Sequence, residues 1–150
     1  MTTVVRAVRP EDADTMYALG CEAAGVRLDR QVFDVMFKSC LSSSQHRAVL
    51  VMMDELPAGW GELEISYSMM SPGLTATLAE LYIRPAYRSR GAGRAALIHL
   101  AETARRMGCR QMLATCSRVN LRSRDFLEQN GFCMGRVQFE HPLSAPDRSE

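Results

Sequence analysis

One short segment of the chain is strongly positive, because no acidic residue lies between Glu80 and Glu102. Glycines at 91 and 93 within it lack a Cβ, so backbone N–H groups there can take positive φ and approach a ligand closely. A helical pattern follows directly, and a helix N-terminus attracts anions. The segment therefore predicts an anion site suited to a pyrophosphate. Its four arginines are Arg84, Arg88, Arg90 and Arg94.

Two other nucleotide-binding motifs fit this loop less well. A Walker A loop needs Lys and then Ser or Thr after its last glycine, whereas Arg94 and Ala95 follow Gly93 here. The run from Gly91 to Ala96 satisfies the dinucleotide fingerprint G-x-G-x-x-A. However, six residues separate it from the preceding predicted strand, and the following strand lacks the acidic residue that would bind a ribose. A dinucleotide site is therefore the weaker alternative.

The composition indicates a single globular domain. The chain has 150 residues, of which 47% are hydrophobic, and this is enough for one core. A net charge of +1 argues against a general nucleic-acid binder, which needs a basic excess. The longest apolar run, residues 48–53, is too short to span a membrane. The first residues lack the basic and apolar regions of a secretory signal, so we expect a cytoplasmic protein.

The cysteines and histidines show no metal-binding or disulfide pattern. Five cysteines, without a C-x-x-C pair, indicate free thiols. Cys116 would need a histidine brought in by the fold to act as a nucleophile, so we expect a buried, inert thiol there. The three histidines, His46, His99 and His141, are scattered, so we expect no metal.

The first half of the chain alternates between strand and helix patterns. Asp12 and Asp29 can each cap a helix. Residues 54–57 are rich in turn formers between two strand patterns, which predicts an antiparallel hairpin. The predicted strands are residues 4–9, 47–53, 59–68 and 75–84. The helix after Asp29 should bury Phe33, Met36, Phe37, Cys40 and Leu41, which recur at helical spacing.

The second half predicts crossover helices. An amphipathic helix runs from Gly93 to a C-cap at Gly108, and a strand follows at 110–116. Asn120 can cap a helix that ends at Gly131. This order of elements implies an α/β protein with a mixed sheet covered by helices. A last strand is predicted at residues 132–141, which could pair with a second copy in a homodimer, and a flexible tail at 144–150.

Residues 88–94 also satisfy the pattern Q/R-x-x-G-x-G/A, and with it the sequence resembles the GNAT superfamily of N-acetyltransferases. The resemblance covers residues 1–143 as one domain and is closest to the aminoalkylphosphonate N-acetyltransferases. It implies the acyl-CoA N-acyltransferase fold: a mixed, mostly antiparallel sheet, helices on both faces, and a splay between strands 4 and 5. The matching segments are Arg6–Asp12, Ala79–Pro85, Arg88–Arg94 and Asn120–Phe132.

The resemblance also implies acetyl-CoA as cosubstrate. Its pantetheine amides would pair with the exposed backbone of the fourth strand, which is an unusual sheet edge unless a ligand covers it. Asn120 would lie near the pantetheine, although capping the following helix explains this residue equally well. The implied cofactor-binding residues are Leu81, Tyr82, Ile83, Arg88, Ser89, Arg90, Gly91, Ala92, Gly93, Arg94 and Asn120.

Glu80 is the expected general base. An acceptor amine is protonated at neutral pH and cannot attack a thioester until a base removes the proton. We expect Glu80 to share a strand face with Leu78 and Tyr82, beside the thioester. A solvent-facing position is the alternative for Glu80. The usual general-acid Tyr of the family is replaced by Leu127, so Tyr82 or Tyr67 is the expected substitute.

The expected reaction is acetyl transfer to the primary amine of a small molecule, with neither nucleic acid nor membrane as partner. Two alternatives stay open: a catalytically weak sensor of acyl-CoA, which the missing acid would explain, and a protein or peptide N-acetyltransferase. The acceptor pocket would lie between the first two helices and the connection after the hairpin. Its candidate residues are Arg27, Arg30, Tyr67, Met69 and Met70.

Overall fold

The computed structural model of the chain describes residues 2–144, so residues 145–150 of the expected tail lie outside the described part. The chain divides into two compact units, the first ending at Thr115 and the second beginning at Cys116. The first unit holds β1 (Thr3–Ala7), α1 (Ala13–Ala24), α2 (Arg30–Ser42), β2 (His46–Met53), β3 (Leu56–Ser66), β4 (Leu74–Ile83), α3 (Ala92–Arg106) and β5 (Cys109–Ala114). The second holds α4 (Leu121–Gln129).

The five strands form one sheet in chain order, β1 to β5. The first four strands are antiparallel to their neighbours, and β5 is parallel to β4. Asp54 and Glu55 form the tight turn between β2 and β3, with φ of 50° and 68°. Positive φ at two successive turn residues matches the twist of a two-residue hairpin. The predicted mixed, mostly antiparallel sheet and its hairpin are therefore confirmed.

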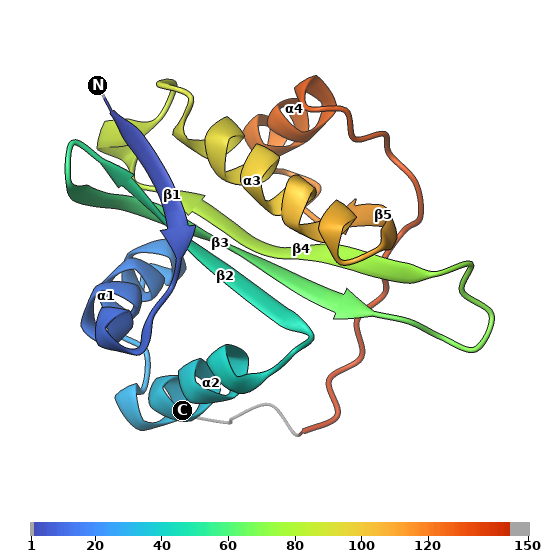
Figure 1. Cartoon of the computed structure of the whole chain (residues 1–150), viewed down its shortest axis with the longest axis horizontal. Helices are drawn as coiled ribbons and strands as arrows, with labels where there is room; N and C mark the ends of the chain where they lie inside the picture. The colour runs from blue at the N-terminus through green and yellow to red at the C-terminus, as the bar shows by residue number, and fades with distance from the viewer. Residues whose placement is uncertain (1, 145–150) are drawn as a thin grey trace. The chain divides into compact units, whose positions relative to one another are not determined.

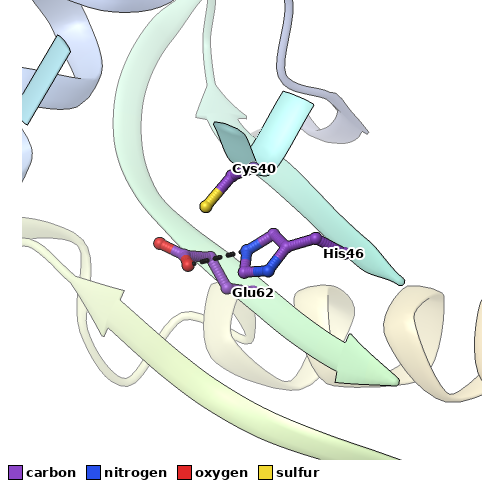
Figure 2. Close-up of side chains that lie close together, drawn as sticks. All are labelled: Cys40, His46 and Glu62. Atoms are coloured by element: carbon purple, nitrogen blue, oxygen red, sulfur yellow. Dashed lines mark hydrogen bonds and ion pairs between the residues drawn. The ribbon is translucent and has the colours of Figure 1, made fainter. Parts of the chain in front are cut away.

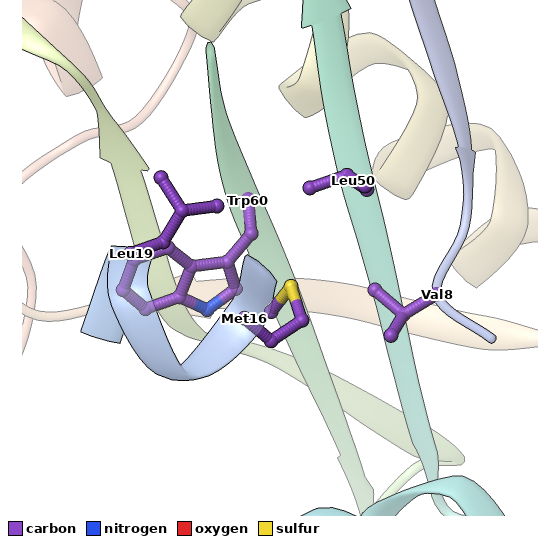
Figure 3. Packing of buried hydrophobic residues seen from close by; sticks show 5 residues of the cluster. All are labelled: Val8, Met16, Leu19, Leu50 and Trp60. Atoms are coloured by element: carbon purple, nitrogen blue, oxygen red, sulfur yellow. The ribbon is translucent and has the colours of Figure 1, made fainter. Parts of the chain in front are cut away.

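The two faces of the sheet bury different helices, as successive residues of β2 illustrate. Leu50 packs with Met16 and Leu19 of α1 and with Trp60 of β3 (Figure 3). Val51, on the opposite face, belongs to the cluster that contains the first turns of α3. Helices α1 and α2 therefore cover one face, and α3 covers the other (Figure 1). Alternation along a strand produces this two-sided burial.

The ends of the first two helices are largely as predicted. The Asp29 carboxylate accepts a hydrogen bond from the N–H of Val32, at 3.1 Å, and so caps α2. Helix α1 begins directly after Asp12, but the Asp12 side chain makes no cap hydrogen bond to that helix. The predicted burial of Met36 in the apolar stripe of α2 is wrong, because this residue is 59% exposed. Phe33, Phe37 and Leu41 of the same stripe do pack against the core.

The predicted last strand is wrong. Residues 132–144 form neither helix nor strand, and Val137 and Phe139 are 63% and 91% exposed. An alternating pattern becomes a strand only where a neighbouring strand accepts its hydrogen bonds. Since the second unit contains no other strand within its described residues 116–144, the pattern has no partner there. The homodimer edge expected from this strand loses its basis.

Candidate functional site

Strand β4 has one edge that is covered along only half its length. β5 pairs with residues 74–78, whereas β3 pairs with β4 as far as Ile83. The predicted splay between strands 4 and 5 is therefore present, and it begins after Leu78. Beyond that point β3 is the only strand paired with β4 among residues 2–144, so the other edge of β4 is uncovered there. An uncovered edge in the middle of a sheet offers hydrogen-bonding groups to an extended ligand.

The hydrogen bonds at the end of β4 indicate which backbone groups face this open edge. The Arg84 N–H donates to the Ala58 carbonyl on the β3 side, at 2.8 Å. The Ile83 carbonyl accepts from Nε of Arg88 instead, also at 2.8 Å. Backbone groups of successive strand residues point to opposite edges. Leu81 and Ile83 therefore present their N–H and C=O groups on the edge away from β3.

A β-bulge at Ala79 sets the direction of Glu80. Glu62 of β3 lies opposite Glu80, but the next residue, Leu63, lies opposite Leu78, so Ala79 has no partner. Residues directly opposite each other share a face. Glu80 therefore shares a face with Tyr82 and Glu62, while Leu78 lies on the other face. The expectation that Glu80 shares a strand face with Leu78 is wrong, because the extra residue at the bulge interrupts the alternation of side chains between the two faces. The expectation that Glu80 shares a face with Tyr82 is confirmed.

Glu80 is exposed, yet its protonation is altered by its surroundings. Partial desolvation, and then the negative charge of Glu62, raise the pKa of Glu80 above its usual value. A carboxylate with a raised pKa accepts a proton more readily. Its exposure agrees with the solvent-facing alternative, and its altered pKa agrees with a base.

Glu62 is the residue of this region that the sequence reasoning missed. Its Oε1 atom accepts a hydrogen bond from Trp60 Nε1 at 2.8 Å. Its Oε2 atom lies 3.0 Å from His46 Nε2 (Figure 2). Burial alone would raise the pKa of Glu62, but these hydrogen bonds outweigh it and lower the pKa. The signal was available in the alternation of Trp60, Glu62 and Glu64, which places two carboxylates on the same strand face as a large aromatic ring.

Tyr82 is partly buried and packed rather than free. Its ring lies 5.5 Å from the Trp60 ring and contacts the core cluster on the α1 side. The Tyr82 ring also contacts the Arg88 guanidinium, which lies 5.8 Å from the ring centroid. Leu81 and Ile83 direct their side chains into the α3-side cluster. The side chains of Leu81, Tyr82 and Ile83 therefore anchor the strand. Of these three expected cofactor-binding residues, only Leu81 and Ile83 present their backbone groups at the open edge, because the Tyr82 backbone faces β3.

The loop after β4 has the predicted left-handed conformation at Gly91 but not at Gly93, which lies in the first turn of α3. Ser89 and Gly91 have φ of 62° and 85°, both in the left-handed region. The first hydrogen bond of α3 joins the Ala95 N–H to the Gly91 carbonyl, at 3.0 Å. The N–H groups of residues 92–94 therefore precede the helical ladder, at the positive end of the helix dipole. Ala92 is buried, Gly93 is half-buried, and Arg90 and Arg94 are exposed.

The arginines of this segment divide between structural and exposed positions. Arg84 forms an ion pair with Glu22 of α1, at 2.8 Å, and donates to the Pro57 carbonyl. Arg88 donates to Ile83 as described above, so its Nε atom supports the loop. The local positive charge therefore has two functions: part of it fastens the loop to the sheet, and part of it faces solvent.

The five candidate acceptor residues do not gather at one place. Arg27 and Arg30 line an open hollow of about 470 Å³ together with Tyr17, between α1 and α2. Arg30 is engaged there by Asp14 and Asp34. Tyr67 and Met69 lie instead in the connection between β3 and β4, where they are 68% and 100% exposed, with Met70 beside them at 92%.

In the second unit, Asn120 caps α4. Its side-chain oxygen accepts from the Ser123 N–H at 3.1 Å, as the capping explanation predicted.

Cys116 is exposed rather than buried, so the expectation of an enclosed thiol is wrong. The strand before Cys116 was predicted to extend to residue 116, but β5 ends at Ala114, so Cys116 lies outside the sheet. The five cysteines are free, as their spacing predicted. Within residues 2–144, no helix combines the length and apolar character needed to cross a membrane.

Comparison with solved structures identifies the fold. The aminoglycoside N-acetyltransferase AAC(6')-Iy, solved with a bisubstrate analogue, is 18% identical, with a TM-score of 0.86 over 96% of this chain and 100% of that one. A putative acetyltransferase from Agrobacterium tumefaciens is 21% identical, with a TM-score of 0.84 over 93% and 99%. Glucosamine-6-phosphate N-acetyltransferase from Arabidopsis thaliana is 16% identical, with a TM-score of 0.79 over 96% and 100%.

A search of curated protein sequences finds no significant match. The family itself is identified by a sequence model, "Acetyltransferase (GNAT) family", which matches residues 13–132 and so most of the chain. This match includes β4, the glycine loop and α3, which carry the motif pattern. The chain therefore belongs to the GNAT family of acetyltransferases and is an acetyl-CoA-dependent N-acetyltransferase.

Proposed function

We propose that the protein transfers the acetyl group of acetyl-CoA directly to the primary amine of a small molecule, with Glu80 as general base. One observation carries this proposal: the open half of β4 leads straight into a left-handed loop and the N-terminus of α3. An open strand edge can pair with the amides of an extended arm, and the helix N-terminus that follows it can bind a diphosphate, so the two together suit a ligand that has both groups.

In this proposal, residues 88–94 bind the pyrophosphate. The N–H groups of residues 92–94 supply hydrogen bonds without a side chain, and Arg90 and Arg94 supply positive charge at the surface. Gly91 is required because its left-handed conformation is unfavourable for a residue with a Cβ. Arg88 contributes from the side by holding the Ile83 carbonyl, which fixes the loop to the strand that it follows.

The pantetheine arm would extend along Leu81 and Ile83 as an added strand. Its amides would pair with backbone groups that lack a β5 partner in that half of β4. A backbone N–H at this edge would also hold the thioester oxygen as negative charge develops on it.

The transfer step requires one proton acceptor and one proton donor. Glu80 removes a proton from the ammonium group of the acceptor, so that the free amine can attack the thioester carbonyl carbon. The new C–N bond forms, and the nitrogen, which is now positively charged, loses its second proton to water. The tetrahedral intermediate then collapses to the amide, and the C–S bond breaks with the electron pair leaving on sulfur. The thiolate then takes a proton from Tyr82 or from water. Because a thiol has a pKa of about 8.5, it leaves adequately even without a strong acid.

The acceptor class is a small-molecule amine. Relatives in fold are described as acting on aminoglycosides and on glucosamine 6-phosphate, which are amines of this class. The aminoalkylphosphonates suggested by the sequence remain candidates, since Arg27 lines a hollow that could receive an anionic group, whereas Arg30 beside it is already paired with Asp14 and Asp34. Tyr67 and Met69 would contact the acceptor from the β3–β4 connection.

The test is a thiol-release assay with acetyl-CoA and a panel of acceptors: an aminoglycoside, glucosamine 6-phosphate, an aminoalkylphosphonate and a peptide with a free N-terminus. The expected result is release of CoA with at least one small amine and none with acetyl-CoA alone. Release with the peptide and not with the small amines would contradict the proposed acceptor class.

A second function follows from Leu127, which stands where many relatives carry the acid Tyr. A chain without an efficient acid could bind acyl-CoA as a sensor and turn over slowly. Binding of acetyl-CoA with no thiol release across the whole panel would favour this function over catalysis.

A further inference from the structure

We propose that Cys40, His46 and Glu62 form a binding site for a zinc-class divalent cation. The three side chains meet on the α1 and α2 side of the sheet, although their spacing in the sequence showed no metal-binding pattern (Figure 2). Cys40 comes from the last turns of α2, His46 begins β2, and Glu62 lies in the middle of β3. Their potential ligand atoms all lie within 4.8 Å of one another.

The geometry needs only a small adjustment to coordinate a metal. Zinc binds sulfur at about 2.3 Å and histidine nitrogen or carboxylate oxygen at about 2.0–2.2 Å, in a tetrahedral arrangement. His46 Nε2 and Glu62 Oε2 are already 3.0 Å apart, close to the separation of two ligands on one zinc ion. The Cys40 thiol, which Figure 2 shows directed toward the other two side chains, completes three ligands and leaves the fourth position for water.

The set of donors selects the class of cation. Thiolate and imidazole are ligands that favour zinc, whereas magnesium and calcium prefer sites built only from oxygen. All three side chains are partly buried, so the site excludes most of the solvent that competes for a metal. Glu64 lies opposite His46 in the sheet and adds negative charge beside the cluster. A divalent cation would be attracted by that charge.

An outer hydrogen bond already orients one ligand. The Trp60 indole donates to Glu62 Oε1 at 2.8 Å, which leaves Oε2 directed at His46. Partners of this kind hold a ligating carboxylate in one orientation and increase metal affinity. Trp60 itself is buried in the core on that face, so its position is held by packing.

Metal binding at this site would release the proton of the Cys40 thiol. The Cys40 thiol must lose its proton to become a ligand, and that proton passes to solvent. His46 is neutral when it binds a metal, with its remaining proton on Nδ1 rather than Nε2. In the metal-free protein, burial and then the nearby carboxylates raise the pKa of Cys40, so the thiol is protonated at neutral pH.

The experiment titrates the chelator-treated protein with Zn²⁺, Co²⁺ and Mg²⁺ separately. We expect one Zn²⁺ per chain, proton release on Zn²⁺ binding by calorimetry in two buffers, a thiolate-to-cobalt absorption band with Co²⁺, and no binding of Mg²⁺. Cys40→Ser should abolish the band and weaken Zn²⁺ binding by about a hundredfold or more, and Trp60→Phe should weaken it about tenfold. Cys109→Ser, in another partly buried cysteine, is the matched control and should change neither result.

A second measurement does not depend on variants that fold. In the unmodified protein, Zn²⁺ should protect Cys40 from a thiol reagent and leave the reactivity of Cys109 unchanged, as located by peptide mapping. Absence of Zn²⁺ binding, binding that survives Cys40→Ser, or equal protection of both cysteines would each overturn the proposal.

Discussion

At the level of single side chains, the opposition of Glu62 and Glu80 is the feature with the clearest chemical consequence. The two carboxylates lie across from each other on β3 and β4, and they differ in environment. Glu62 is held by Trp60 and His46 and has a lowered pKa, whereas Glu80 is more exposed and has a raised pKa. Two acidic groups whose environments separate their pKa values are suited to different roles.

Replacing Glu80 tests its role as base. Glu80→Gln keeps the shape of the side chain but removes its ability to accept a proton. We expect the rate of acetyl transfer at limiting acceptor to fall by about a hundredfold or more, with unchanged affinity for acetyl-CoA. Glu64→Gln, which removes a charge from the same strand face as Glu62, is the control and should retain activity. An unchanged pH–rate profile in Glu80→Gln would exclude Glu80 as the base.

Among the secondary-structure elements, the pairing of β3 with β4 depends on a close backbone approach. A Cβ added at Gly59 would lie 2.9 Å from the Ile83 Cα and still closer to the Tyr82 carbonyl oxygen. These atoms belong to the backbone of β4 and cannot rotate away. The close approach places Tyr82 and Ile83, and therefore the open edge of β4, at a defined position.

Gly59→Ala should therefore disturb both stability and the site. We expect the free energy of unfolding to fall by about 3 kcal/mol, because overpacking against backbone is not relieved by side-chain movement. Gly20→Ala in α1 is the control: its nearest contact is Leu28 Cδ1 at 3.4 Å, and alanine favours a helix over glycine by about 0.5–1 kcal/mol. Urea unfolding measures both, and equal stability of the two variants would contradict the packing argument.

The connection from β1 to α1 is fastened by one ion pair. Arg6 donates to both oxygens of Asp12, at 2.8 and 2.9 Å, and the Arg9 N–H donates to the same carboxylate at 2.8 Å. The hydrogen bond from Arg6 is the largest influence on Asp12, and the balance of effects lowers its pKa. Asp12 is only 7% exposed, so these bonds are largely shielded from water.

This ion pair predicts a loss of stability in acid. A carboxyl whose pKa is lower in the folded than in the unfolded state stabilises the fold above its unfolded value of about 3.9, and this contribution is lost as the pH falls through the folded value. Asp12→Asn should cost about 2–3 kcal/mol at neutral pH and should flatten the pH dependence of stability in that acidic range. Asp125→Asn, for which the structure describes no ion pair within residues 2–144, is the control. Parallel pH profiles for Asp12→Asn and the unaltered protein would contradict the prediction.

For the molecule as a whole, charge distribution matters more than net charge. The chain carries only one net positive charge, yet the segment before α3 holds four arginines without a neighbouring acid in sequence. Two of them, Arg84 and Arg88, also bind other parts of the first unit. A nearly neutral protein can therefore attract an anionic cosubstrate at one place without binding anions generally.

Binding of acetyl-CoA should stabilise the folded protein and should weaken as salt rises. At a concentration about 100 times its dissociation constant, a ligand that binds only the folded state adds about 2.7 kcal/mol of stability. Salt screens exposed charges, so the apparent affinity should fall at high ionic strength. Thermal unfolding with and without acetyl-CoA measures this, and Gly91→Ala should reduce the effect because its loop conformation favours glycine. Identical unfolding curves with and without acetyl-CoA would refute cosubstrate binding.

Local chemistry was sufficient to predict much of this protein. Capping at Asp29 and Asn120, the turn at Asp54 and Glu55, and the glycine loop before α3 all depend on neighbouring residues, and the structure contains each of them. The motif pattern likewise predicted the family. These features depend on backbone preferences within a few residues, which a sequence expresses directly.

The remaining features depend on contacts between residues far apart in the chain. The bulge at Ala79 turns Glu80 away from the face of Leu78, and the pairing of β3 with β4 brings Glu62 opposite it. Cys40, His46 and Glu62 meet because a helix packs over two strands. The expected strand at 132–141 fails for the same reason, since alternation alone provides no hydrogen-bonding partner. Strand register and partner choice are properties of the assembled sheet, so only the tertiary structure could decide them.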